Sequence, residues 1–347
     1  LAHARILKLD ISAARTAPGV LLVVTGNEWV AAGYGAIPCR TPVRTNIDGS
    51  PFKEPVRHCL ATDTVRQVGE PIALVVAETA AQARHAADLV EVDYDQLPAV
   101  ADPVKALGGD AAQLWPGIPG NLCLDFSLGD AKAVDAAITA AAHVVRLTVV
   151  NNRVTAVAME PRGVVADYDA ASGLITLWNA SQNIHSNRDI YANTILKMPP
   201  EKLRHVAPDV GCGFGAKNSV YPEPALLAHA AKTLGRPVKW TADRSEAFLT
   251  DTHGRDQVSE VTLALDANQK FTALKVDTIG NLGAWCGTMG PFTPTGGTAR
   301  TQGGPYAIPA MNYTARAVFT NTSQTDPYRG AGRPEASFHI ERIVEFA

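Results

Sequence analysis

The alternation of apolar and polar residues predicts strands and helices in turn over the first hundred residues. The unbroken apolar run at 71–77 is typical of a buried strand. A helix is expected at 79–89, because Thr79 and Gln82 have the spacing of a capping box. Residues 90–94 alternate and predict a second strand. This strand–helix–strand unit, together with apolar runs at 1–9 and 20–25, indicates an N-terminal α/β domain over residues 1–107.

A glycine- and proline-rich stretch follows and predicts a linker at 108–122. Beyond it, Asp130 is placed to cap an alanine-rich helix that ends near Ala142. Another helix is expected at 223–234, stopped by Gly235 and Pro237. Strand-like segments lie between them, at 143–150, 163–168, 174–178 and 238–241. The expected fold class is therefore α+β, with a second domain over 123–347.

Three glycines alternate with other residues in Gly211-Cys212-Gly213-Phe214-Gly215-Ala216-Lys217, which we term the first glycine loop. Glycine is favoured where the backbone takes positive φ or approaches a ligand closely. The apolar run at 205–210 predicts a strand before the loop, and the helix at 223–234 follows it. Unpaired N–H groups between a strand and a helix suit an anion such as phosphate. The helix dipole alone contributes only about 0.3–1 kcal/mol, so other segments must take part.

Two familiar phosphate motifs compare poorly with this loop. A Walker loop requires Gly-Lys-Ser/Thr at its end, whereas Ala216 precedes Lys217 and Asn218 follows it. The dinucleotide fingerprint G-x-G-x-x-A is closer, with Asp243 as its acidic residue. However, Pro222 and Pro224 delay the helix, and Asp243 lies further along than the usual distance of about 20 residues. The dinucleotide site stays open as the less favoured alternative.

A second glycine loop, Asp326 to Glu335, also opens a helix, with Pro334 in its first turn. Arg329 and Arg333 flank Gly330-Ala331-Gly332, and arginine presents a fixed set of donors to phosphate. Two loops that can each bind an anion predict a large ligand with several anionic groups. For the second loop taken alone, the alternative is an exposed turn with solvated arginines. The glycine-rich segment at 280–304 either wraps a site or forms an irregular surface connection.

Composition narrows the function classes. The 347 residues are 46% hydrophobic with a net charge of −3, which gives no electrostatic argument for nucleic acid or an anionic membrane. No apolar run reaches the roughly 18–20 residues of a membrane helix, and no signal segment is recognisable, so we expect a cytoplasmic protein.

The five cysteines form no C-x-x-C pair, which argues against zinc and iron–sulfur sites, and each is expected to be buried. Both ends of the sequence look cut.

Several motifs, in order, resemble the molybdenum-cofactor subunit of the xanthine dehydrogenase and aldehyde oxidase family. The stretch at 68–100 is similar to that family's α/β hammerhead domain. The later motifs follow the order of its molybdopterin-binding domain: Met159-Glu-Pro-Arg-Gly163, Ser181-Gln182, the first glycine loop, Gly235-Arg-Pro-Val238, His253-Gly-Arg255 and Tyr328-Arg-Gly-Ala-Gly-Arg333. The resemblance implies a hammerhead domain at 1–107 and the N-terminal, incomplete part of a molybdopterin-binding domain at 123–347. The chain resembles carbon monoxide dehydrogenase large chains but lacks their copper-binding cysteine loop.

The resemblance implies a pyranopterin that carries molybdenum, which in bacterial members of the family is usually the cytosine dinucleotide form. It implies that Gln182 hydrogen-bonds an oxo ligand of the metal and that Phe214 and Arg329 pack beside the metal. None of these three ligates molybdenum directly, because the pterin's sulfurs hold it. The residues implied in cofactor binding are Gln182, Gly211, Cys212, Gly213, Phe214, Gly215, Arg329, Gly330 and Ala331.

The family reaction is hydroxylation of an aldehyde or an electron-poor heterocycle with oxygen from water. Its glutamate base lies in a Gly-x-Gly-Glu motif that this sequence lacks, so no catalytic base is assigned here. We expect Glu160 and Glu223 to form salt bridges or caps instead. The chain is then a fragment or one half of a divided subunit, and alone it should not oxidise substrate. The implied partners are a 2Fe-2S subunit, an FAD subunit and a second molybdopterin half-subunit.

Departures from the family motifs bear on the substrate. Purine-oxidising members carry a glutamate and a phenylalanine where this sequence has Asn218 and Ala331, so purines are disfavoured. Carbon monoxide is disfavoured because Tyr328–Arg333 contains no cysteine for copper. An aldehyde or an N-heteroaromatic compound remains as the expected substrate. The non-enzymatic alternative is a binding or assembly module that lacks half of its site.

Overall fold

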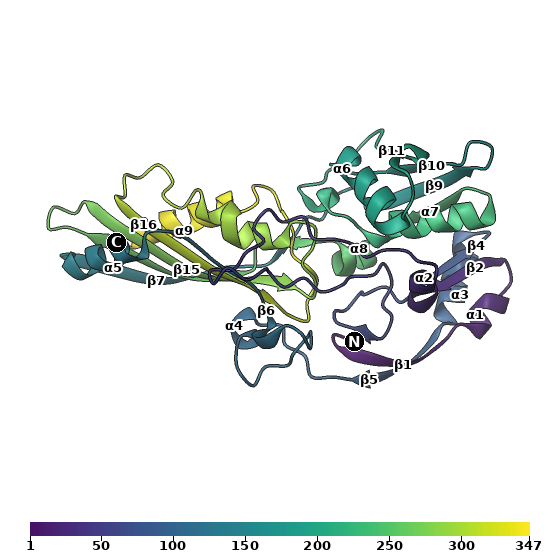
Figure 1. Ribbon diagram of the computed structural model, residues 1–347, viewed down its shortest axis with the longest axis horizontal. Helices are drawn as coiled ribbons and strands as arrows, with labels where there is room; N and C mark the ends of the chain where they lie inside the picture. The colour runs from purple at the N-terminus through teal and green to yellow at the C-terminus, as the bar shows by residue number, and fades with distance from the viewer.

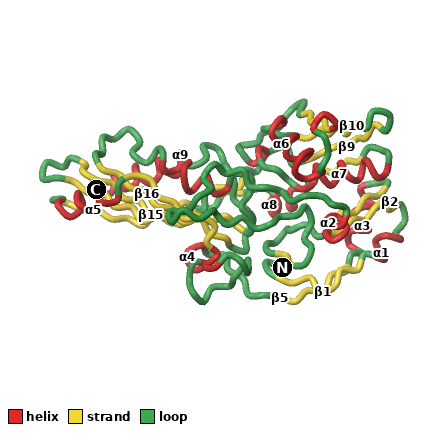
Figure 2. Tube along the Cα trace, in the orientation of Figure 1, coloured by secondary structure: helices red, strands yellow, loops and turns green.

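The computed structural model describes all residues, 1–347, as an elongated molecule (Figure 1). A five-stranded sheet with its helices forms one end. At the other end a four-stranded sheet lies above the N-terminal unit, and long loops fill the middle (Figure 2). Helices and strands occur in both halves, as the α+β expectation requires. None of the helices has the length and apolar character needed to cross a membrane.

The N-terminal unit has two small sheets, of strand orders β3-β1-β5 and β2-β4. Its strands are β1 (Ala4–Asp10), β2 (Val20–Thr25), β3 (Thr64–Val65), β4 (Ala73–Ala77) and β5 (Glu91–Gln96). Its helices are α1 (Ser12–Thr16), α2 (Gly26–Ala31), α3 (Ala80–Asp88) and α4 (Pro103–Ala106). The Thr79–Gln82 capping box at the start of α3 is confirmed.

The predicted strand–helix–strand unit is corrected in one respect. Strands β4 and β5 flank α3 in sequence, but β4 pairs with β2 and β5 pairs with β1, both antiparallel. The two strands therefore lie in different sheets. Periodicity identifies each strand, but it does not state which partner a strand's edge will take.

The four-stranded sheet has the order β11-β10-β9-β12, with β9 (Gly163–Asp169), β10 (Leu174–Asn179), β11 (Leu203–Val206) and β12 (Val238–Thr241). Helix α7 (Pro222–Leu234) packs on β9, β10 and β12. Between β10 and β11 lie α6 (Ile184–Asp189), the π-helix η2 (Ile190–Leu196) that continues it, and the short turn η3 (Pro200–Lys202). The strand expected at 205–210 was wrong in its bounds, because β11 ends at Val206 and the chain then leaves the sheet.

The five-stranded sheet has the order β6-β16-β15-β14-β7. Its strands are β6 (Leu122–Gly129), β7 (His143–Asn151), β14 (Gln257–Leu265), β15 (Phe271–Gly283) and β16 (Ala310–Phe319). Helix α5 (Ala131–Ala140), capped by Asp130 as predicted, packs on one face through Val134. Helix α9 (Arg333–Phe346) covers the other face through Ile340 and Ile343. The remaining elements are short: β8 (Val154–Thr155), β13 (His253–Gly254), α8 (Arg244–Thr250), η1 (Pro119–Asn121), η4 (Ala216–Asn218), η5 (Gly290–Phe292) and η6 (Thr293–Gly297).

The N-terminal unit shares its largest hydrophobic core with the four-stranded sheet. Trp29 of α2 is fully buried in the same cluster as Tyr191 and Leu227. The segment expected as a linker is also packed, since Leu114 and Ile118 are buried beside β6 and the end of β15. The two predicted domains are therefore joined by continuous apolar contacts, and the boundary at residue 107 stays a prediction.

Polar contacts also join the N-terminal unit to the later chain. The Arg66 Nε donates to the carbonyl oxygen of Leu114 at 3.0 Å, and its guanidinium lies 3.7 Å from the centre of the Trp115 ring. The Asn321 side chain donates to the Arg66 carbonyl oxygen at 3.0 Å. Glu70 accepts a hydrogen bond from the Arg66 backbone N–H at 2.6 Å. Burial outweighs this contact and raises the pKa of Glu70 to about 7.

Replacing Glu70 by glutamine is expected to flatten the dependence of stability on pH. Because the folded carboxyl has the raised pKa, the folded state holds a proton that the unfolded chain loses above its ordinary pKa. The free energy of unfolding should therefore fall by up to about 3 kcal/mol as the pH rises to 7 and beyond. Urea unfolding between pH 4 and pH 8 should show this fall in the wild type and not in Glu70→Gln. The exposed Glu91→Gln variant is the control; equal slopes in Glu70→Gln and the wild type would contradict the interpretation.

Candidate cofactor-binding site

The first glycine loop has an unusual backbone. Cys212, Phe214 and Gly215 have φ values of +72°, +52° and +97°, whereas Gly213 does not have positive φ. Such alternation turns successive N–H groups toward one side and forms a concave anion site. The backbone N–H groups of Gly213 and Phe214 donate to no acceptor within the chain. Non-glycine residues with positive φ cost about 1–3 kcal/mol each and cluster at ligand sites.

The second glycine loop has three consecutive residues with positive φ. They are Gly330, Ala331 and Gly332, at +100°, +45° and +96°. The loop is fixed at its C-terminal end, where the Gly332 N–H donates to the buried Glu335 carboxylate at 2.9 Å. The Gly330 N–H and the exposed Arg329 guanidinium have no partner within the chain. Both groups are therefore free to donate to an anion.

The two glycine loops are in direct contact. The Arg329 N–H donates to the Phe214 carbonyl oxygen at 2.8 Å. A Cβ atom on Gly215 would lie only 2.2 Å from the Pro327 carbonyl oxygen, so glycine is required for this approach. The structure therefore places the free donors of both loops in one region, although Lys217 at the end of the first loop and Asp326 at the start of the second are 109 positions apart in sequence.

Gln182 joins this region from the segment after β10. Its side-chain oxygen accepts from the Gly215 N–H at 2.9 Å, and its backbone N–H donates to the Lys217 carbonyl oxygen. A Cβ atom on Gly213 would lie 2.3 Å from the same side-chain oxygen. The amide NH₂ of Gln182 has no partner within the chain, so it remains free to donate to a ligand.

Lys217 is used for structure. Its ammonium group, on a side chain that is 2% exposed, donates to the Glu160 carboxylate at 2.6 Å. The same carboxylate oxygen accepts from the Gly211 N–H at 2.7 Å. Although partial burial acts in the opposite direction, these two contacts lower the pKa of Glu160. Glu160 therefore forms a salt bridge and a loop cap, the role that we expected in place of general base.

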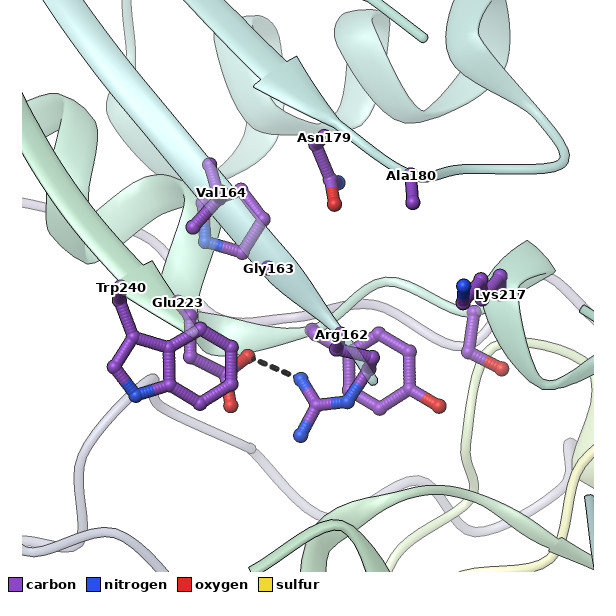
Figure 3. Close-up of a pocket in the computed structure, with 11 residues that line it drawn as sticks. Arg162, Gly163, Val164, Asn179, Ala180, Lys217, Glu223 and Trp240 are labelled. Carbon is purple, nitrogen blue, oxygen red and sulfur yellow. Dashed lines mark hydrogen bonds and ion pairs between the residues drawn. The ribbon is translucent and has the colours of Figure 1, made fainter. Parts of the chain in front are cut away.

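Glu223 has a structural partner as well, the buried Arg162. The guanidinium of Arg162 donates to Glu223 at 2.7 Å (Figure 3). It also donates to Asp251 at 2.6 Å. It also lies 3.9 Å from the centre of the Tyr221 ring. Although burial acts in the opposite direction, Glu223, Tyr221 and Asp251 raise the pKa of Arg162. The cavity beside this group has a volume of about 10 Å³, which is room for roughly one water molecule and not for a substrate.

Helix α9 and the second glycine loop are held by Arg255. Its guanidinium donates to Glu335 at 2.9 Å and to the Arg329 carbonyl oxygen at 2.7 Å. Glu335 is fully buried, and Arg255 itself has a φ of +64°. This contact runs between β13 and α9, and nothing in the spacing of the sequence indicates it.

The glycine-rich segment at 280–304 lies against the second glycine loop and is largely buried, so its interpretation as a surface connection was wrong. A Cβ atom on Gly332 would lie 2.4 Å from the Gly297 carbonyl carbon, and one on Gly287 would lie 3.0 Å from the Asp326 carboxyl carbon. The segment therefore forms the wall behind the second glycine loop.

The remaining site residues differ in position. Cys212 is exposed, in contrast to Cys39, Cys59, Cys123 and Cys286, which are buried as expected. Asn218 ends the short turn η4 and is half-buried, and its side chain has no hydrogen bond. Ala331 is half-buried at the tip of the second loop.

An open groove of about 330 Å³, larger than the cavity beside Arg162, lies between α6 and β11. No residue of either glycine loop lines it.

The structure opposes the dinucleotide alternative. A dinucleotide fold needs parallel strands around the glycine turn, but the sheet beside the first loop contains only one parallel pair, β10 and β11. Asp243 caps α8 by accepting from the Glu246 N–H at 2.7 Å, so it is engaged in the fold. The first loop also runs into the short turn η4 (Ala216–Asn218) and not directly into α7, which begins at Pro222.

These residues fit a large anionic cofactor. The donors without partners are the N–H groups of Gly213, Phe214 and Gly330, the Gln182 amide and the Arg329 guanidinium. Four of these groups are neutral hydrogen-bond donors and the fifth is a cation. None of the five is a carboxylate, which would repel phosphate. No group of acidic, histidine or cysteine residues could hold a metal ion directly. The free donors suit an organic cofactor that carries several anionic oxygens.

Two family models match the chain. Residues 1–98 match the aldehyde oxidase and xanthine dehydrogenase a/b hammerhead domain, and residues 114–347 match the molybdopterin cofactor-binding domain. The predicted boundary between domains lies in the interval between the two matches.

Curated relatives agree with these models. The chain is 37% identical over 352 residues to the gamma subunit of the 6-hydroxypseudooxynicotine dehydrogenase complex of Paenarthrobacter nicotinovorans, covering 100% of this chain and 42% of that protein. It is 32% identical to the nicotine 6-hydroxylase large subunit of the same organism, covering 99% of this chain and 41% of that protein. The chain thus spans less than half the length of these relatives.

A solved structure shares the fold. Quinoline 2-oxidoreductase from Pseudomonas putida 86 superimposes with a TM-score of 0.90 at 32% identity, covering 99% of this chain and 43% of that one. The similarity extends over the N-terminal unit, both larger sheets and the loops between them.

Proposed function

Because the chain belongs to the aldehyde oxidase and xanthine dehydrogenase family of molybdopterin-binding proteins, we propose that it forms one side of the cofactor site of a molybdenum hydroxylase. The observation that carries the proposal is the contact between the two glycine loops, which gathers five free donor groups in one region. The cofactor would be molybdopterin, in its cytosine dinucleotide form. The number of donors agrees with a ligand that has several phosphate oxygens.

These groups take two roles in the proposal. The N–H groups of Gly213 and Phe214 and the guanidinium of Arg329 bind anionic oxygens of the cofactor. The free amide of Gln182 donates to an oxygen ligand of the metal. When bound, such a cofactor supplies a two-electron oxidation in which the substrate gains oxygen from water. The chain orients the cofactor and excludes water from one side of it.

The general base is proposed to come from outside these 347 residues. Glu160 and Glu223 are both engaged in ion pairs, at 2.6 and 2.7 Å, which hold their carboxylates against Lys217 and Arg162. We propose that a further segment, or a second half-subunit, supplies the glutamate. Electrons released by the oxidation would leave through partner subunits that carry 2Fe-2S and FAD groups.

The proposed substrate is an N-heteroaromatic compound, with an aldehyde as the alternative. The names of the relatives that act on nicotine and quinoline support the first class. Asn218 and Ala331 would leave room near the two loops, because one side chain is short and polar and the other is a single methyl group. The absence of cysteine in the second loop disfavours carbon monoxide.

Because the proposal places the cofactor-binding residues in this chain and the general base outside it, the catalytic activity of the isolated chain tests this division of the site. The isolated 347-residue chain is expected to show no turnover, because it lacks the base. The complete complex should hydroxylate a panel of N-heteroaromatic compounds and aldehydes, and in ¹⁸O-labelled water the product should gain the label. Turnover by the isolated chain loaded with molybdenum would contradict the divided site. A loaded complete complex that is inert toward the whole panel would favour the binding or assembly module instead.

A further inference from the structure

Asp326, the first residue of the second glycine loop, has a buried carboxylate that accepts three hydrogen bonds. It is 1% exposed. Its Oδ2 accepts from the Ser219 hydroxyl at 2.6 Å and from the Thr288 N–H at 2.9 Å. Its Oδ1 accepts from the Met289 N–H at 2.7 Å. Three chain segments that are distant in sequence therefore meet at one side chain.

These segments are the ones that shape the proposed cofactor site. Ser219 lies two residues after the first glycine loop, and its neighbour Val220 donates its N–H to the Thr288 hydroxyl at 2.8 Å. Thr288 and Met289 belong to the wall at 280–304. Asp326 itself precedes Pro327, the residue that contacts Gly215. A shift of the carboxylate would therefore change the distance between the two loops.

Asparagine cannot reproduce these contacts. Both carboxylate oxygens accept backbone N–H groups, so an amide NH₂ would face either the Thr288 or the Met289 donor. No arginine or lysine forms an ion pair with Asp326. Burial raises its pKa, and the three donors together with the more distant Arg57 charge act in the opposite direction. A buried carboxylate without an ion pair is costly to a fold, unlike an apolar residue of the same size.

We infer that Asp326 is a positioning residue, which holds the first glycine loop, the 280–304 wall and the second glycine loop at the separation that cofactor binding requires. This inference rests on the proposed function. Asp326 touches no group offered to the cofactor; it acts through Ser219 and Pro327. Its loss should loosen both loops without unfolding the two larger sheets.

The test compares Asp326→Asn with a matched control in the complete complex. The control is Asp277→Asn, since Asp277 also accepts from a threonine hydroxyl, that of Thr314, but lies within β15. Molybdenum and pterin per folded chain should fall roughly ten-fold in Asp326→Asn, because a buried donor is left without an acceptor, and should not change in the control. In cofactor-free protein, deuterium exchange at 211–219 and 327–332 should be faster in Asp326→Asn alone.

Equal cofactor content and equal exchange in Asp326→Asn and Asp277→Asn would overturn the inference. If Asp326→Asn fails to fold, Ser219→Ala decides, since it removes only one hydroxyl, which donates to Asp326 at 2.6 Å and lies 3.4 Å from the Thr252 hydroxyl. Ser219→Ala with reduced cofactor content and an unchanged melting temperature supports the inference, and wild-type content contradicts it. A wild-type complex without molybdenum would refute the proposed function instead, while the exchange measurement would still test Asp326.

Discussion

Replacing Gly215 by alanine is expected to abolish cofactor binding while leaving the fold intact. The added Cβ atom would lie 2.2 Å from the Pro327 carbonyl oxygen, whereas ordinary van der Waals contact begins at 3.4 Å, so the two loops must separate by 3.4 − 2.2 = 1.2 Å. The backbone φ of +97° adds strain for any L side chain. A displacement of about 1 Å at a catalytic site can lower the rate roughly hundred-fold. We expect a loss of at least this size in kcat/KM.

The matched control for this change is Gly173→Ala. Gly173 also has positive φ, at +70°, but a Cβ atom there would meet nothing within 4 Å. This variant should lose roughly 1 kcal/mol of stability through backbone strain and should keep its molybdenum. Equal cofactor content in the two alanine variants would show that the contact between the loops is not needed for binding.

Replacing Arg162 by methionine is expected to have the largest effect on stability. The change leaves Glu223 and Asp251, which share this guanidinium at 2.7 and 2.6 Å, without a cation. Breaking a buried ion pair by removing one partner typically costs about 3–5 kcal/mol. The Tyr221 ring, 3.9 Å away, also loses its cation–π contact. Urea unfolding at pH 7 should show a loss in this range.

Two comparisons isolate the charge effect. Arg5→Met breaks an exposed pair with Asp95, whose side chains are 61% and 41% exposed, and should cost at most about 1 kcal/mol. Adding Glu223→Gln and Asp251→Asn to Arg162→Met should recover much of the lost stability, because the stranded charges are then gone. A triple variant as unstable as Arg162→Met would show that packing, and not charge, explains the loss.

The sequence predicts much of this fold because its local signals are strong. The Asp130 cap, the Thr79–Gln82 capping box and the strand at 238–241 are each determined by residues within a few positions of one another, and all three are confirmed. The partner of a strand is a different matter. The pairing of β4 with β2, and not with β5, depends on contacts between distant segments that periodicity does not contain.

For the candidate site as well, the sequence predicts some features and not others. The glycines of both loops mark it in the sequence, but the positive φ of Cys212, Phe214 and Ala331 does not follow from those residue types. The contacts of Arg255 with Glu335 and of Asp326 with Ser219 join positions 80 and 107 residues apart. No spacing rule indicates such pairs, because they arise only when the sheets have brought the loops together.

The most direct test of the central claim is the cofactor content of the complete complex. The two glycine loops are proposed to hold a molybdopterin jointly, so the wild-type complex should contain about one molybdenum and one pterin for each copy of this chain. Elemental analysis and pterin fluorescence on the same sample would measure both. The account predicts this ratio for the wild type and for Gly173→Ala, and a near-complete loss of both signals in Gly215→Ala. A purified wild-type complex with neither molybdenum nor pterin would contradict it.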